Sequence, residues 1–360
     1  MTCCTERPWA ALLLALALVT PAAAREWRVA PGGAGGGTPD LQDVLARVRP
    51  GDVVTLAPGE YRVSLVTQVD GTAAAPITLR GPASAVLRSD GRRGHLFDLR
   101  HDHYRLEGFT LDGRHGAPDR RDGYVNKLLY VQGRRPAAGV RGLRVVGLTL
   151  RNAGGECLRI RHRASDIEVR DSHIHHCGLF DYRFGGGRQN GEGIYVGTSS
   201  RQWNDGRNPL PGPDTTHDVR LLHNRIATHG AECVDVKEGA HDVRIEGNRC
   251  SAVRDPRAGA INLRGDHNTV RGNHISDVAG FGIRLGGSRV AGRRYGLHNV
   301  VRDNHIERAA AGGLNVRAWP QDLICGNRFG PAVTPRWRGP ARGVDPAGPC
   351  PPDQSSAGKR

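Results

Sequence analysis

The stretch DVRIEGNRC (residues 242–250) is followed along the chain by NTVRGNHI (268–275) and NVVRDNHI (299–306), which repeat the same short pattern. Further copies are DIEVRDSHI (166–174), DVRLLHNRI (218–226) and DLICGNRF (322–329). Where connections are short, the copies recur every ~22 to 27 residues, as expected of a solenoid. One column of the repeat holds Asn224, Asn248, Asn273, Asn304 and Asn327. We expect these side chains to form an internal ladder that satisfies backbone groups at a turn.

A second pattern lies between the copies of the first. Its copies are ECLRIR (156–161), EGIYVG (192–197), ECVDVK (232–237), GAINLR (259–264), FGIRLG (281–286) and GLNVR (313–317). Apolar residues alternate with others in these segments, which is the period of a strand and not of a helix. The pairs predicted to stack inward are Leu158/Ile160, Ile194/Val196, Val234/Val236, Ile261/Leu263, Ile283/Leu285 and Leu314/Val316. The sequence therefore predicts an all-β protein, a single-stranded right-handed parallel β-helix.

Both ends of the predicted solenoid differ from its middle. FTLDG (109–113) and LTLRN (148–152) are typical of earlier coils, and residues 40–48 form a short amphipathic pattern that predicts an N-terminal capping helix. We expect a signal peptide over 1–24, the β-helix domain over 25–335 and an irregular C-terminal tail over 336–360. Two insertions, 179–190 and 199–215, are predicted to flank one face.

The N-terminal segment predicts export. Arg7 precedes an apolar run over 10–19, and the small residues at 22–24 offer a cleavage site. The later sequence has no apolar run of the ~20 residues that a membrane span requires, so we expect a secreted protein without a membrane partner. The six cysteines outside the signal are predicted to pair as Cys157/Cys177, Cys233/Cys250 and Cys325/Cys350.

The chain is strongly basic, with a formal net charge of +15 and an isoelectric point near 10.2. Such a field concentrates polyanions at the surface. Aromatic residues are few and no nucleic-acid motif is present, so we expect an acidic polysaccharide and not a nucleic acid as the partner of a monomeric protein.

Alternation also predicts which side chains face outward, at positions two, four and six of the strand pattern. These are Tyr195, then Cys233, Asp235 and Lys237, then Asn262 and Arg264, then Arg284, then Asn315 and Arg317. Neighbouring coils lie ~4.8 Å apart, so Lys237 and Arg264 are expected side by side, with an anionic partner to bridge them. Lysine is rare here, three residues against 48 arginines (51 minus three). An amine whose pKa is lowered by a neighbouring cation can serve as a general base, whereas a guanidinium cannot.

These segments resemble the β-helical polysaccharide lyases that include chondroitinase B and alginate lyases. PGDVVTLAPGEYRV (50–63) and GTAAAPITLRG (71–81) are similar to the opening coil of that family, and GAINLRGDHNTVRGNHI (259–275) with FGIRLGG (281–287) is similar to its active-site coils. The resemblance implies that Lys237 removes the C5 proton of a uronic acid, that Arg264 assists and that Arg284 helps to hold the substrate. Tyr195, Asn262, Arg317 and Asp235 are further expected substrate contacts.

The resemblance to the calcium-dependent members is incomplete. They hold Ca²⁺ with an asparagine and two glutamates, five and seven residues before the lysine. Here Glu232 lies five before Lys237, but Gly230 takes the second place. Glu192 and Asp235 could complete an altered oxygen site with Glu232, and Ca²⁺ is the expected ion. In the competing interpretation Glu156, Glu192 and Glu232 form a structural column balanced by arginines and backbone donors.

Other functions remain open at this point. A C5-epimerase would abstract the same proton and return it from the other face. A glycoside hydrolase would use Glu192, Glu232 or Asp235 as paired carboxylates. A non-catalytic β-helix would bind acidic glycans through its arginines. His229, just before the Glu232 strand, is a weaker candidate for contact with the substrate.

Overall fold

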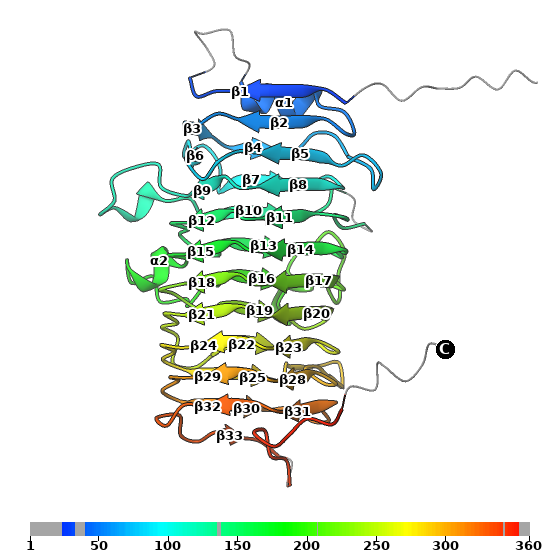
Figure 1. Cartoon of the computed structure of the whole chain (residues 1–360), viewed down its shortest axis with the longest axis vertical. Coiled ribbons are helices and arrows are strands. Elements are labelled where there is room, and N and C mark those ends of the chain that lie inside the picture. The colour runs from blue at the N-terminus through cyan, green and yellow to red at the C-terminus, as the bar shows by residue number, and fades with distance from the viewer. Residues whose placement is uncertain (1–23, 33–39, 135–137, 207, 341–342, 353–360) are drawn as a thin grey trace, which may run out of the picture.

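The computed structural model describes residues 24–32, 40–134, 138–206, 208–340 and 343–352. These residues wind into successive coils whose strands form three parallel sheets along the molecule (Figure 1). The architecture is the right-handed parallel β-helix that the repeats predict. Residues 1–23 of the expected signal peptide lie outside the described residues.

Each coil contributes one strand to each sheet. The first sheet contains β1 (Glu26–Val29), β2 (Val53–Leu56), β5 (Ile77–Arg80), β8 (Tyr104–Glu107), β11 (Arg144–Val146), β14 (Ile167–Arg170), β17 (His217–Leu222), β20 (His241–Glu246), β23 (Thr269–Arg271), β28 (Val300–Arg302) and β31 (Leu323–Cys325). The second contains β4 (Leu65–Val66), β7 (His95–Leu99), β10 (Lys127–Val131), β13 (Leu158–Ile160), β16 (Ile194–Val196), β19 (Val234–Val236), β22 (Gly259–Leu263), β25 (Phe281–Leu285), β30 (Gly312–Val316) and β33 (Trp337–Arg338). The third contains β3 (Gly59–Val63), β6 (Ala85–Ser89), β9 (Thr110–Asp112), β12 (Thr149–Arg151), β15 (His173–His175), β18 (Arg225–Ala227), β21 (Arg249–Ser251), β24 (His274–Ile275), β29 (His305–Ile306) and β32 (Arg328–Phe329).

The interior is one continuous apolar core between the three sheets. All twelve residues of the predicted inward pairs, from Leu158 to Val316, belong to it. Each coil leaves its apolar residues uncovered on two sides until its neighbours stack on them, so burial supplies the energy that holds the coils in register.

The asparagine column forms the predicted ladder. At each step a side-chain Oδ1 accepts from the backbone N–H and the Nδ2 of the asparagine one coil before, as Asn273 does from Asn248 at 2.9 and 3.0 Å. Five asparagines from Asn224 to Asn327 continue this pattern. A second ladder of Asn268, Asn299 and Gln321, which the sequence analysis missed, lies beside β23 and β28.

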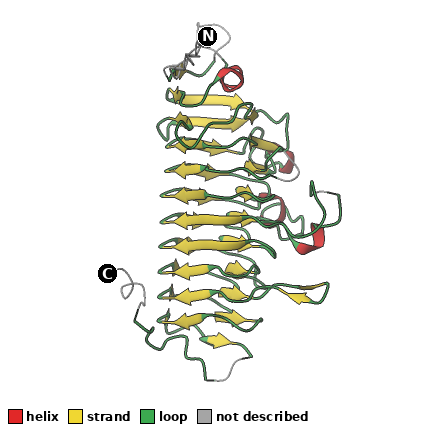
Figure 2. Cartoon of the chain, turned by 90° about the vertical axis from the view of Figure 1, so that its right-hand side faces the viewer, coloured by secondary structure: helices red, strands yellow, loops and turns green. Residues whose placement is uncertain are grey.

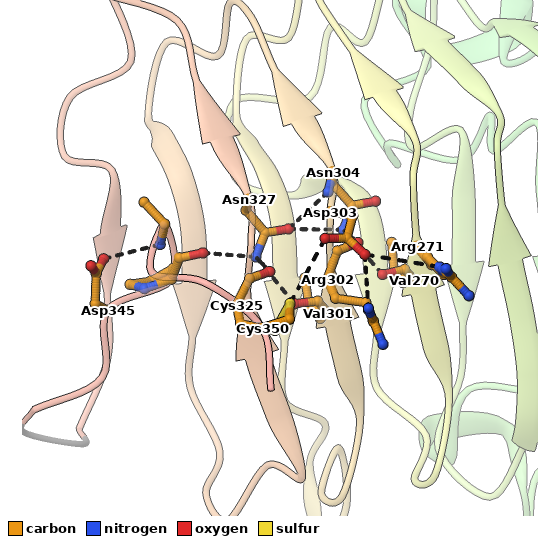
Figure 3. The surroundings of a disulfide bond; sticks show 12 residues. Val270, Arg271, Val301, Arg302, Asp303, Asn304, Cys325, Asn327, Asp345 and Cys350 are labelled. Atoms are coloured by element: carbon orange, nitrogen blue, oxygen red, sulfur yellow. Dashed lines mark hydrogen bonds and ion pairs between the residues drawn. A yellow bond between two sulfur atoms is a disulfide. The ribbon is translucent and has the colours of Figure 1, made fainter. Parts of the chain in front are cut away.

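All three predicted disulfides are present. Cys325–Cys350 ties the C-terminal segment to the last coils beside Asn327, as Figure 3 shows. The expected outward position of Cys233 is wrong, because this residue lies in the apolar core and bonds to Cys250 of β21. Alternation is broken at the strand entrance, where the chain still turns toward the interior, and it resumes at Val234.

A capping helix at the N-terminal end and several loops between strands complete the fold. Helix α1 (Leu41–Arg47) begins at Asp40, which accepts a hydrogen bond from Gln42 N at 2.8 Å, and it buries Leu41, Val44 and Leu45 over the open end of the core. The two predicted insertions carry helix α2 (Leu179–Tyr182) and a 3₁₀ turn (Ser200–Gln202). Two other loops carry a second 3₁₀ turn (Arg121–Gly123) and the hairpin of β26 (Arg289–Val290) and β27 (Arg293–Arg294). Figure 2 shows helical segments and this hairpin standing out from one side of the stack.

The β-helix extends slightly past its predicted C-terminal boundary. Strand β33 pairs with β30, so the second sheet continues a little beyond residue 335.

No helix among the described residues is long and apolar enough to cross a membrane.

Candidate functional site

The outer face of the second sheet carries a continuous polar stripe. Its central column is Arg159, Tyr195, Asp235, Asn262, Arg284 and Asn315, one residue on each coil in direct register. The register Val236 with Leu263 puts the following residues, Lys237 and Arg264, on neighbouring coils beside the same column. The stacking of coils therefore gathers the predicted site residues on one face.

Three buried carboxylates meet at the middle of this stripe. One oxygen from each of Glu192, Glu232 and Asp235 lies within 4.8 Å of the others. They come from the entrances of two consecutive coils and from β19 itself, and they are the three residues predicted to form a metal site. Asn262 adds its amide, which donates to Glu232 Oε1 at 2.6 Å.

The cluster carries more negative charge than its surroundings balance. Burial, with the charges of Asp235 and Glu192, raises the pKa of Glu232 well above its usual value. Burial also raises the pKa of Glu192, although Lys237 opposes the shift. The Oδ1 of Asp235, a residue that is 1% exposed, is buried without a hydrogen-bond partner among the described residues. Clustered carboxylate oxygens with one of them unpartnered are the donor set that Ca²⁺ prefers, so these residues fit a calcium ion.

Lys237 faces this cluster instead of a free groove. Its Nζ pairs with Asp235 Oδ2, lies 3.6 Å from Glu192 Oε1 and lies 4.2 Å from the ring centroid of Tyr195. Burial lowers the pKa of Lys237, but Asp235, Tyr195 and Glu192 outweigh burial and raise it. The expectation that a neighbouring cation lowers this pKa is therefore wrong in the described arrangement. Arg264 does lower the pKa of Lys237, but its effect is smaller than the opposing effects of Asp235, Tyr195 and Glu192.

Arg264 has a carboxylate of its own, which the sequence analysis missed. Its Nη2 and Nε lie 2.6 and 3.0 Å from Glu238 Oε1. Burial opposes ionisation of Glu238, yet Arg264 and backbone donors outweigh it and lower the pKa of Glu238 to about 2. The expected anion bridging Lys237 and Arg264 is thus replaced by two separate partners. Glu238 lies just past the strand, where alternation no longer predicts direction.

Arg284 is a cation of the stripe that has no ion-pair partner among the described residues. Within the described part of the chain no carboxylate lies at ion-pair distance from it, and its Nε is buried without a hydrogen bond. Burial lowers the pKa of Arg284, and the charges of Arg317 and Arg264 lower it further. Arg317 follows β30 and is exposed. A set of uncompensated guanidiniums at this end of the stripe favours binding of an anion.

Loops cover the middle of the stripe. Ser199 N donates to Tyr195 Oη at 3.3 Å, Gln202 Oε1 accepts from Arg159 at 3.2 Å, and Trp203 packs edge-on against Tyr295. As a result the Lys237 side chain, which was expected to face outward, is only 8% exposed in the described conformation. Access is greater toward Arg264, Arg284 and Arg317, where exposure rises along the stripe.

A second ionic cluster precedes the carboxylates. Glu156 binds Lys127 at 3.0 Å and Arg159 at 2.9 Å, and these cations outweigh burial and lower the pKa of Glu156 to about 2. Glu156 is therefore balanced by cations, as the interpretation of a structural column predicts, whereas Glu192 accepts from Gly191 N at 2.9 Å and Glu232 accepts from Asn262, and neither of these two has an arginine partner among the described residues. His229 instead stacks on His176 with ring centroids 4.4 Å apart, in a histidine group of the third sheet.

Known proteins share this architecture. The model of the family described as right handed beta helix region matches residues 142–329. No curated protein sequence matches this chain. Among solved structures, an alginate lyase from Paenibacillus sp. str. FPU-7 is 22% identical with a TM-score of 0.64, over 86% of this chain and 99% of that chain.

Two further structures are similar. A mannuronic acid specific polysaccharide family 6 lyase from human gut microbiota is 16% identical with a TM-score of 0.58, over 89% of this chain and 70% of its own. The pectate lyase Pel9A is 14% identical with a TM-score of 0.55, over 87% and 82%. At these identities the likeness shows the fold.

Proposed function

The chain belongs to the right-handed β-helix family, and from that premise we propose that it is a polysaccharide lyase that cleaves a uronic-acid polymer by β-elimination. Its structural neighbours include an alginate lyase, a mannuronic acid specific lyase and a pectate lyase, enzymes that are named for acidic polysaccharides. The net charge of +15 supports a polyanionic substrate.

The observation that carries the proposal is the uncompensated guanidinium of Arg284, next to an amine and a carboxylate cluster on the same face. A C5 proton is weakly acidic unless the adjacent carboxylate is neutralised. Arg284 and Arg317 supply positive charge where the substrate carboxylate would lie, and a preorganised cation stabilises a carbanion-like transition state. The contacts of Asn262 and Tyr195 would orient the sugar ring.

In the proposed reaction the neutral amine of Lys237 accepts the C5 proton, with Arg264 assisting. The electron pair of the C5–H bond forms the C4=C5 double bond, the C4–O bond breaks, the departing oxygen takes a proton from solvent water, and the Lys237 ammonium returns its proton to the solvent. A general base of this kind contributes ~10²- to 10⁴-fold. Asp235 pairs with Lys237 and raises the pKa of its amine, so the role requires Asp235 to move away and let Lys237 lose its proton before the reaction. The Oδ1 of Asp235 has no hydrogen bond among the described residues that would oppose this movement.

We propose Ca²⁺ as the ion held by Glu192, Glu232 and Asp235. When bound, the ion supplies charge neutralisation near the substrate carboxylate. Chelated protein titrated with CaCl₂ should release heat in calorimetry, and Glu232→Gln should weaken that binding at least about tenfold because one anionic ligand is lost. Equal binding by the variant would contradict the assignment.

The decisive experiment is an assay of uronate polymers at 235 nm. Wild type should generate unsaturated ends, Lys237→Ala should abolish them, and Arg284→Ala should lower kcat/KM by about 10²-fold or more because a transition-state charge is unmatched. The matched control is Arg328→Ala on the third sheet, exposed and distant from the stripe, which should retain full activity. A fully active Lys237→Ala would refute the mechanism.

A second function has one observation in its favour. The raised pKa of Glu232 is that of a carboxyl able to donate a proton, and the carboxylates lie within 4.8 Å. Retaining glycosidases hold their two carboxyl groups ~5 to 5.5 Å apart. A hydrolase would produce saturated reducing ends without absorbance at 235 nm, whereas a C5-epimerase would change sugar configuration without cutting the chain.

We also propose that residues 1–24 direct export and that the protein acts outside the cytoplasm. Three disulfides fit an oxidising compartment. In this proposal the β-helix over 25–335 is the domain that binds and cleaves the substrate. N-terminal sequencing of the exported protein should begin near Arg25.

A further inference from the structure

A separate cavity of about 410 Å³ opens beside the stripe, on the side from which the coils enter the second sheet. Its floor includes Asn126, Gly155 and Asn190. Asn126 and Gly155 directly precede Lys127 and Glu156, and Asn190 lies two residues before Glu192. The floor therefore spans three consecutive coils, those of β10, β13 and β16, next to the two ionic clusters.

Two insertions form the walls. One runs over 114–126 and carries the turn with Arg121, and the other carries α2 with Phe180 and continues to Arg188. Figure 1 shows the first segment, coloured cyan, and α2 projecting from the same side at neighbouring levels. The guanidinium carbon of Arg121 lies 4.5 Å from the ring centroid of Phe180, so the insertions meet at this ring.

The ring of Phe180 is held in place by the backbone around it. A Cβ on Gly154 would lie 2.3 Å from Cζ of the ring, so a larger residue at this position would displace the ring. Asp181 Oδ2 accepts from Asn190 N at 2.8 Å, and Gly186 N donates to Phe180 O at 2.9 Å, which close the loop on itself. The wall is thus preorganised without a ligand.

Helix α2 carries two aromatic rings, of which Phe180 lines the cavity. The hydroxyl of the other, Tyr182, is buried without a partner among the described residues. Burial, followed by the charges of Asp255 and Glu232, raises the pKa of Tyr182.

The lining has the chemistry of an acidic-sugar site. Neither Arg121 nor Arg188 has a carboxylate within ion-pair distance in the described part of the chain, so both guanidiniums can pair with a ligand carboxylate. Phe180 offers a sugar ring the part of its surface that Arg121 does not cover, and Asn126 and Asn190 offer amides to hydroxyl groups. The carboxylate in the lining, Asp181, already accepts a hydrogen bond from Asn190 N. The cavity volume falls within the ~300 to 1,000 Å³ range of small-ligand pockets.

We propose that this cavity is a subsite that binds a uronate residue of the polymer at a distance from the bond that is cleaved. The inference rests on the proposed function and adds a determinant of chain-length preference to it. Coils stack ~4.8 Å apart, so the cavity at β10, β13 and β16 lies one to several coils from Lys237 and Arg264. A chain must be long enough to fill both places, and binding energy at the remote place then favours longer substrates.

The test measures calorimetric binding of oligomannuronates and oligogalacturonates of graded length to Lys237→Ala protein, in which cleavage is removed. Affinity should rise at the length that reaches the cavity. In the double variants with Arg188→Ala or Phe180→Ala, the ratio of long-chain to short-chain affinity should fall about tenfold or more, because a charge-assisted contact or a stacking face is lost. The matched control is Arg93→Ala, an exposed arginine outside the cavity, which should keep the full ratio.

An unchanged ratio in both Arg188→Ala and Phe180→Ala would overturn the subsite, even if wild type proves to be a lyase. Absence of any length dependence in the parent protein would overturn it as well. If wild type generates no unsaturated ends but the two variants still lose long-chain affinity, the proposed function fails and the subsite stands. Near-ultraviolet circular dichroism of each variant verifies that the fold is retained.

Discussion

At the scale of single residues, the buried polar groups of this protein depend on partners in neighbouring coils. Asn273 shows the cost of removing one. Its Nδ2 donates to Ile245 O at 2.8 Å and to Asn304 Oδ1 at 2.9 Å, while its Oδ1 accepts from Asn248 N. Alanine would leave these groups buried without partners, at ~1 to 3 kcal/mol for each unsatisfied group.

We therefore predict that Asn273→Ala lowers the free energy of unfolding by about 3 kcal/mol or more, measured by urea denaturation. Asn204, exposed in a loop, is the control, and its alanine variant should change stability by less than about 0.5 kcal/mol. Equal losses of unfolding free energy in the two variants would show that the ladder contributes no more to stability than an exposed loop residue does.

The contacts of individual residues also determine the chemistry of the site. Lys237 and Arg264 occupy the predicted neighbouring positions, yet they pair with Asp235 and Glu238 and not with a shared anion. Strand alternation predicts which face a side chain lies on. It does not predict which of several nearby carboxylates that side chain will choose, because the choice depends on residues of the adjacent coil and of the turn after the strand.

At the scale of elements, strand β15 and its turn gather His173, His175 and His176, with His229 stacked on His176. Burial, and then the charges of His173 and His176, lower the pKa of His175 to about 4. The pKa of His175 is lower in the folded protein than in the unfolded chain, where it is near 6.5. The neutral imidazole therefore contributes to folding stability above pH 6.5, and this contribution is lost as the pH falls from 6.5 through the pKa of the folded protein.

The melting temperature of wild type should accordingly fall between pH 6.5 and 4, and His175→Gln should flatten this decline because the variant has no imidazole to protonate. His115→Gln, at a partly exposed position of the 114–126 segment, serves as the control and should follow wild type. A decline of unchanged steepness in His175→Gln would contradict the prediction.

Two disulfides of similar loop length allow another prediction at this scale. Cys233–Cys250 closes 17 residues and ties β19 to β21 in the core, whereas Cys325–Cys350 closes 25 residues and ties down the C-terminal segment. Chain entropy alone predicts similar effects, ~3 kcal/mol each. The terminal segment can separate locally without exposing the core, however, so its bond contributes less to global unfolding.

The variant Cys233→Ala/Cys250→Ala should lose about 2 to 4 kcal/mol of unfolding free energy in urea, and Cys325→Ala/Cys350→Ala should lose clearly less. The reverse order would mean that the C-terminal segment is part of the cooperative unit.

At the scale of the whole molecule, the positive charge supplies attraction that requires no single contact. With a net charge of +15, binding of a polyuronate should weaken roughly tenfold or more between low salt and 0.5 M NaCl, because screening shortens the range of the field. Calorimetric titration of Lys237→Ala protein across a salt series measures this, and a neutral glucan is the control ligand. Salt-independent binding would indicate that the contacts are mainly apolar.

The sequence by itself determined the solenoid. Period-two alternation, the asparagine column, the cap pattern and the cysteine spacing each describe a local or nearest-neighbour relation, and a stack of coils is built from such relations. For the same reason the Glu192, Glu232 and Asp235 cluster could be predicted from equivalent positions on adjacent coils.

Tertiary structure alone decided the exposure and charge of the site. The cover over Lys237, the ion pairs of Lys237 and Arg264, and the cavity between Arg121, Phe180 and Arg188 are all made by turns and insertions. These segments have no repeat and no alternation. Their direction is set by what they pack against, and that is known only once the coils are stacked.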